Sequence, residues 1–168
     1  MIKIGHRKYL CERAQIKQKA IFSLDDLYVN MHFWFLFYDF SKYEVEYRVM
    51  EQFNRVEIFW ICKKQMDPYV QFVIEFAFVV TGLKDVEIEK DGVKLKRNAG
   101  TLEFRTTCYM EKDYEDKWRG SRLKELMREA YDKYIIRKRL DDFKNQLYKE
   151  LQALFAEVRS FLHLHAVR

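Results

Sequence analysis

The spacing of hydrophobic residues changes twice along the chain, from helical steps to strand-like alternation and back to helical steps. Ser23 and Asp26 have the spacing of a helix capping box, in which side chains satisfy the first free backbone amides. Apolar residues then recur every three or four positions, which predicts a helix over residues 23–40. The C-terminal part of this aromatic helix is apolar nearly all round, so it needs cover on two sides.

From residue 43 to residue 114 the apolar positions alternate with a period of two, which indicates β-strands. The segment FVIEFAFVV (72–80) is apolar on both faces except at Glu75, so we predict that it is the central strand of a sheet. Asp91 and Gly92 supply the positive φ angles of a tight hairpin turn, and we expect another turn at 98–100. About six strands in antiparallel, up-and-down order follow from these turns.

Helical spacing returns after residue 114, and neither Gly nor Pro interrupts residues 121–168. We predict C-terminal helices over 118–166 with a bend near 134–139, because the apolar stripe shifts its phase there. Residues 1–22, the N-terminal arm, alternate poorly, so a short strand and an irregular helix both remain open. The prediction is one α+β domain over 1–168, with an antiparallel meander sheet packed against the aromatic helix and the long C-terminal helices.

Composition limits the function classes. With 49% hydrophobic and 34% charged residues the chain should fold, and 5 Gly and 1 Pro leave little material for flexible linkers. Cys11, Cys62 and Cys108 form no CxxC pair and are expected to be reduced thiols. No apolar run is long enough to span a membrane and no export signal is recognisable, so elimination favours the cytoplasm.

Positive charge is concentrated in the N-terminal arm, which contains six basic residues and one acidic residue and accounts for the whole net charge of +5. Clustered positive charge at a terminus suits contact with nucleic-acid phosphates. A second basic run follows residue 136, although acidic neighbours dilute it and a solvated face remains the alternative. The candidate anion or nucleic-acid contacts are Arg7, Lys8, Arg13, Lys17, Lys19, Arg137, Lys138 and Arg139.

Catalytic patterns are missing from the sequence. It contains no HExxH, no phosphate loop, no GxGxxG and no GxSxG, and its four histidines have no matched partners. We therefore expect no cofactor and no metal site, and a non-enzymatic function is favoured while catalysis stays open. Glu75 is the candidate pocket carboxylate, because a carboxylate in an apolar strand must be paired, reach solvent or face a cavity. A salt bridge to a neighbouring strand is the expected solution.

Three segments, Gly82–Phe104 (GLKDVEIEKDGVKLKRNAGTLEF), Glu115–Trp118 (EDKW) and Tyr134–Arg139 (YIIRKR), resemble parts of uncharacterised small archaeal proteins. The resemblance covers about half of the chain and implies an archaeal, cytoplasmic protein, with no activity, cofactor or binding residue attached to it. The order of helix, meandering sheet and long C-terminal helix is also similar to that of helix-grip lipid-binding domains, in topology alone.

The leading hypothesis is a non-enzymatic interaction protein that forms homo-oligomers or binds a protein partner through apolar helical surfaces. Its expected interface residues are Phe33, Trp34 and Phe37, because an apolar helix in so small a domain has a second side to cover. The first alternative is a nucleic-acid or ribosome-associated protein that uses the basic arm. The second is a hydrophobic-ligand-binding domain of helix-grip type, with Glu75 lining a pocket between sheet and long helix.

Overall fold

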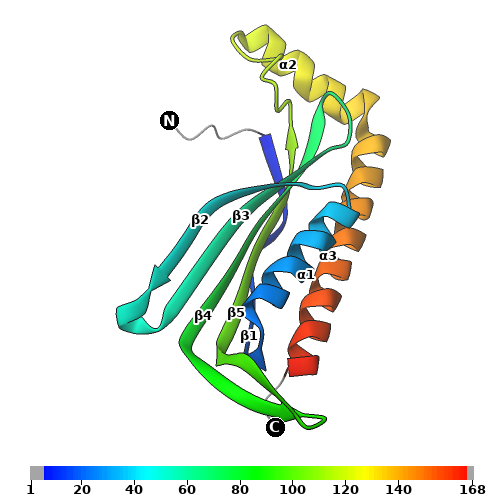
Figure 1. Ribbon diagram of the computed structural model, residues 1–168. Helices are drawn as coiled ribbons and strands as arrows, with labels where there is room; N and C mark the ends of the chain where they lie inside the picture. The colour runs from blue at the N-terminus through cyan, green and yellow to red at the C-terminus, as the bar shows by residue number, and fades with distance from the viewer. Residues whose placement is uncertain (1–5, 166–168) are drawn as a thin grey trace.

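The computed structural model describes residues 6–165, which form a five-stranded antiparallel sheet with helices on one face (Figure 1). The elements are, in chain order, β1 (His6–Phe22), α1 (Leu24–Phe37), β2 (Ser41–Met50), the 3-10 helix η1 (Glu51–Phe53), β3 (Arg55–Gln65), β4 (Val70–Lys90), β5 (Val93–Lys112), α2 (Arg122–Ala130), the π-helical turn η2 (Tyr131–Ile135) and α3 (Arg137–His165).

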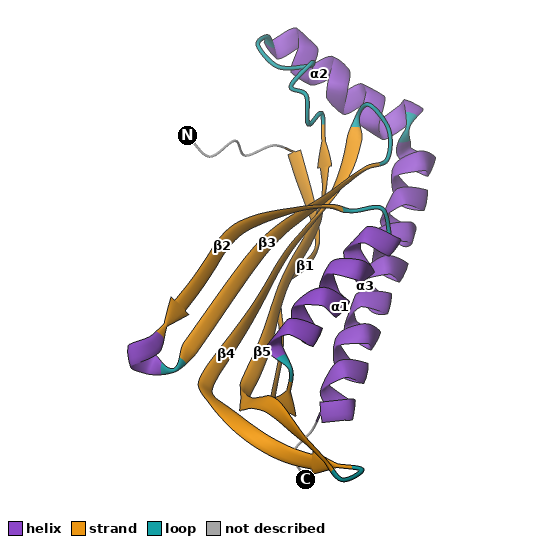
Figure 2. Ribbon diagram, in the orientation of Figure 1, coloured by secondary structure: helices purple, strands orange, loops and turns teal. Residues whose placement is uncertain are grey.

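The strands lie in the order β1-β5-β4-β3-β2, and every neighbouring pair is antiparallel. Strands β2 to β5 follow one another as a meander, as predicted, and β4 is the central strand. β1 adds to the far edge beside β5, so α1 carries the chain from one edge of the sheet to the other (Figure 2). The α+β class with an antiparallel sheet is therefore confirmed.

The sheet has five strands where about six were expected: two predicted pairs of short strands are continuous, which leaves four, and β1 adds the fifth. Segments 72–80 and 86–90 both belong to β4, and the expected turn at 98–100 lies within β5, where Asn98 and Ala99 pair with β4 and Gly100 pairs with Ala20 of β1. A register shift between Thr81 and Lys84, with Gly82 at φ +68°, produces a β-bulge instead of a turn. The hairpin turn at Asp91 and Gly92 is confirmed by their φ angles of 54° and 78°.

The described part of the N-terminal arm is an edge strand. β1 pairs with β5 from His6 opposite Lys112 to Phe22 opposite Asn98, with two register shifts between Tyr9 and Ala14. Each shift moves the following residues to the other face of the strand, which hides the period of two in the sequence. Residues 1–5 of the arm lie outside the described residues.

Helix boundaries follow the local signals. The Ser23 side chain accepts a hydrogen bond from the Asp26 backbone N–H (3.2 Å), as the capping box predicts, but α1 ends at Phe37, before residue 40. The bend in the C-terminal helices is also confirmed, since η2 separates α2 from α3 at 131–135. There the Ile136 N–H donates to the Tyr131 carbonyl oxygen (3.1 Å), which widens the helical turn.

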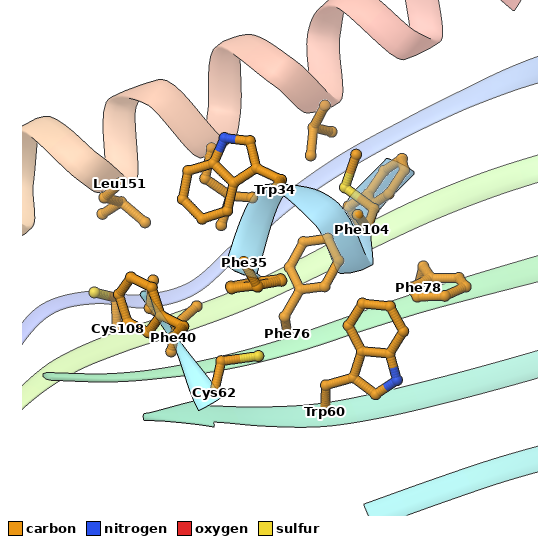
Figure 3. Close-up of a cluster of buried hydrophobic side chains, with 14 of the residues drawn as sticks. Trp34, Phe35, Phe40, Trp60, Cys62, Phe76, Phe78, Phe104, Cys108 and Leu151 are labelled. Carbon is orange, nitrogen blue, oxygen red and sulfur yellow. The ribbon is translucent and has the colours of Figure 1, made fainter. Parts of the chain in front are cut away.

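Aromatic side chains fill the core between the sheet and the helices α1 and α3 (Figure 3). Phe35 on α1 contacts Phe76 on β4, with ring centroids 5.4 Å apart, and Trp60 on β3 contacts Phe78 at 5.3 Å. All four side chains are fully buried. These side chains form one continuous core cluster between the sheet and the two helices.

Candidate functional site

An apolar stripe runs along the outer surface of α1. Val29, Phe33, Leu36 and Phe37 are 47%, 59%, 57% and 81% exposed, and we call these four residues the outer α1 stripe. Their spacing of four, three and one residues places them on one side of the helix. Phe33 and Phe37, two of the three residues expected at an interface, are therefore uncovered by the part of the chain that the structure describes.

The orientation of α1 is held by contacts on its other sides. Met31 and Phe35 are fully buried toward the sheet. On one flank the Asn30 side chain donates to Glu157 of α3 (3.1 Å), and on the other Tyr28 donates to Glu44 of β2 (2.9 Å). Because these contacts fix the rotation of the helix, the outer α1 stripe cannot turn inward without breaking the core.

Trp34, the third expected interface residue, belongs to the interior. It is 8% exposed and its ring stacks on Tyr38 at 4.4 Å between centroids. Residues 33 and 34 point about 100° apart around the helix, so the sheet and α3 cover Trp34 and leave Phe33 bare. Figure 3 shows the Trp34 ring between α1 and α3.

The basic residues of the arm line an edge of the sheet. Lys8, Arg13, Lys17 and Lys19 are exposed on β1. Lys17 lies 3.9 Å from a carboxylate oxygen of Glu103, and Arg7 makes a similar ion pair with Glu111 at 3.7 Å. The Lys17 side chain is 58% exposed, so its ion pair is weak and its charge remains available to anions, whereas Arg7 is largely buried between Glu111 and the Tyr109 ring.

The second basic run, Arg137, Lys138 and Arg139, lies at the exposed start of α3, where Arg139 pairs with Asp67 (3.3 Å). The other end of α3 packs near Phe22, through Phe161. Arg139 and Phe161 are separated by about 33 Å of helix at the standard rise per residue. The structure therefore does not bring Lys17 and Lys19 together with 137–139 in one patch.

Glu75 lies on the helix-free face of the sheet, because its neighbours Ile74 and Phe76 point into the core. It lines a groove of about 450 Å³, whose other lining residues are Arg13, Gln15, Phe59, Ala77, Arg105, Thr106 and Thr107. Glu75 was expected to line a pocket between the sheet and the long helix. The carboxylate lies instead on the opposite face of the sheet. The alternation of β4 places Glu75 on the face opposite Ile74 and Phe76. Which of the two faces the helices cover is decided by tertiary packing.

The partner of Glu75 is a tyrosine. The Tyr109 hydroxyl on β5 donates to a Glu75 carboxylate oxygen (3.2 Å), whereas a Lys or Arg partner was expected. Burial, and then the negative charge of Glu75, raise the pKa of Tyr109 above its usual value. Tyr109 therefore stays protonated at neutral pH and serves as a hydrogen-bond donor to the carboxylate.

Neither a metal cluster nor a membrane-spanning helix is found among residues 6–165. Among the side chains that the structure describes, no three His, Cys, Asp or Glu side chains converge as metal ligands would. The helices in the same range are too short or too polar to cross a bilayer.

Two exposed apolar surfaces were missed in the sequence. Edge strand β2 exposes Tyr43, Val45, Tyr47 and Val49 at 51–57%. Helix α2 exposes Leu123, Leu126 and Met127 at 52–66%. The spacing of these residues predicts a helical stripe. The sequence does not show, however, that α2 extends past the end of the sheet (Figure 1).

Comparisons of this chain with protein-family models, curated protein sequences and solved structures found no match. The functional argument therefore depends on the surfaces described above.

Proposed function

We propose that this protein is a non-enzymatic interaction protein that self-associates through the outer α1 stripe. The observation that supports the proposal is the exposure of Phe33 and Phe37, at 59% and 81%, on a helix whose opposite side, with Met31 and Phe35, is buried against the sheet. Large contiguous apolar patches on a folded domain are typical of interfaces, because burying them removes apolar surface from water.

A second copy of the chain is the partner that fits this stripe. α1 contains no Lys or Arg, and its acidic residues Asp25 and Asp26 lie in the first turn, away from Phe37. An apolar stripe without charges at its centre needs no charge-complementary partner and can pack against itself about a two-fold axis. Aromatic residues such as Phe33 and Phe37 would supply most of the binding free energy.

Size-exclusion chromatography with light scattering tests the proposal, starting from the chain mass of 20.7 kDa. The variant F33Q/F37Q should weaken self-association at least about tenfold, since two large apolar contacts are lost. F53Q is the matched control, because Phe53 is 68% exposed in η1, outside the stripe. A wild-type protein that stays monomeric at every concentration would refute the proposal.

The basic edge of β1 supports a second candidate function, binding of nucleic-acid phosphates. Lys17 and Lys19 are exposed on the same edge strand as Lys8 and Arg13. Binding of a single-stranded RNA should weaken steeply with salt, and K17Q/K19Q should reduce both the affinity and the salt dependence. RNA binding that is unchanged in K17Q/K19Q would exclude this edge as the contact.

A further inference from the structure

β2 is a free edge of the sheet, in contrast to β1. The sheet order places β3 on one side of β2 and no strand of residues 6–165 on the other, so one row of backbone amides and carbonyls lacks strand partners. β1, the other edge, has two register shifts and exposed lysines, both of which discourage edge pairing. β2 has one register shift, between Glu44 and Glu46, and regular pairing from Glu46 to Met50.

The side chains of β2 are self-complementary around Tyr47. In an antiparallel pair of two β2 strands with the two-fold axis at Tyr47, Glu46 of each copy lies opposite Arg48 of the other. An axis at Glu46 or at Arg48 would instead place like charges opposite each other, which is destabilising. Both residues are outside the core, and within one chain they already form an ion pair with each other.

Apolar side chains favour the same register. Tyr47 pairs with Ile58, and Ile58 is buried in the core, so Tyr47 lies on the helix-covered face. Tyr47 is nevertheless 51% exposed, so the contact of α1 with this strand at Glu44 does not cover it. With the axis at Tyr47, the two tyrosines become directly opposite neighbours on this face.

We propose that β2 pairs with β2 of a second copy about a two-fold axis at Tyr47, so that the two sheets become one continuous sheet. The inference rests on the proposed self-association and adds an interface to it. The β2 edge and the outer α1 stripe are different surfaces, so loss of one contact leaves the other intact. A protein with both contacts assembles beyond a dimer, whereas a variant with one contact stops at a dimer.

Charge reversal tests the register, in the F33Q/F37Q background so that only the β2 contact is measured. E46R places two arginines opposite each other, and R48E places two glutamates opposite each other, so each variant alone should dimerise at least about tenfold more weakly. An equimolar mixture of the two restores both opposite-charge pairs and should return to dimers. E87R, an exposed reversal in the distal part of β4, is the control and should dimerise like its parent.

Disulfide trapping gives a second measurement of the same geometry. Y47C in a C11S background should form a disulfide-linked dimer on mild oxidation, because opposite residues in an antiparallel pair lie about 4.5–5.5 Å apart between Cα atoms. Y43C is the matched control: Tyr43 is equally exposed on β2, but its counterpart in this register is residue 51.

The outcomes separate the two interfaces. The β2 pairing would be overturned by any of three results. These are a monomeric F33Q/F37Q protein, a mixture of E46R and R48E that stays monomeric, and a Y43C variant that forms the disulfide-linked dimer as readily as Y47C. If F33Q/F37Q leaves the assembly unchanged while E46R or R48E disrupts it, the α1 contact fails and the β2 pairing stands.

Discussion

At the scale of single residues, Asp113 holds the loop between β5 and α2. It is 6% exposed and has a positive φ of 51°. Its carboxylate accepts hydrogen bonds from the backbone amides of Lys117 (2.9 Å) and Trp118 (3.1 Å), while its own N–H donates to the Tyr69 carbonyl oxygen (2.7 Å). One side chain thus satisfies two backbone donors in a segment without regular secondary structure.

The variant D113A should therefore lower the free energy of unfolding by about 1–3 kcal/mol, because two backbone donors lose a charged acceptor. D113N should cost less, since asparagine tolerates positive φ and its side-chain oxygen still accepts a hydrogen bond. Urea unfolding at pH 7 compares the three proteins. Equal stability of D113A and wild type would show that the loop does not depend on this carboxylate.

At the scale of elements, α2 is the helix with the least support from the rest of the fold. Arg122–Ala130 is nine residues long, and its one buried residue is Arg128. Short helices without tertiary packing are marginal in water. The Ser121 side chain accepts a hydrogen bond from the Leu123 N–H (3.3 Å), which stabilises the start of α2 but covers none of its apolar face.

Backbone amides in α2 should therefore exchange with solvent roughly 100-fold faster than those of α3 between Leu147 and Leu154, both of which are buried. Hydrogen–deuterium exchange with mass spectrometry on the dilute protein measures the difference. Comparable protection in the two helices would mean that the apolar face of α2, with Leu123 and Leu126, is covered in solution.

At the scale of the whole molecule, the fold buries acidic groups that must stay protonated. Burial raises the pKa of the Cys62 and Cys108 thiols to about 12, from an unfolded value of 9.0. Burial also raises the pKa of the Tyr69 and Tyr109 phenols. Above pH 9 the unfolded chain releases these protons first, so it gains stability relative to the folded state.

The free energy of unfolding should therefore be level from about pH 7 to 8 and fall progressively between pH 9 and 12. Denaturant unfolding at a series of alkaline pH values measures this slope. C62A/C108A should have a shallower slope than wild type over the same range, whatever its stability at pH 7, because two titrating groups are removed. Equal slopes in both proteins would show that the thiols do not contribute.

Local patterns were sufficient for most elements of this fold. The capping box at Ser23, the hairpin turn at Asp91 and the bend near Ile136 were all predicted from neighbours in the sequence. The exposure of Phe33 and Phe37 was predicted in part, because an apolar helix has more apolar surface than one sheet can cover. Each of these features depends on residues a few positions apart, so it can be predicted from the spacing of those residues in the sequence.

The spacing of apolar residues along the chain is enough to predict the order of helices and strands and therefore the α+β class. Tertiary structure decided which faces are covered: Trp34 inside and Phe33 outside, Glu75 away from the helices, β1 at one edge and β2 at the other. The physical reason is that the period of the hydrophobic residues distinguishes the two faces of a helix or strand but does not specify which other element packs against each face. Partners are chosen by long-range packing, and bulges such as those in β1 shift the period itself.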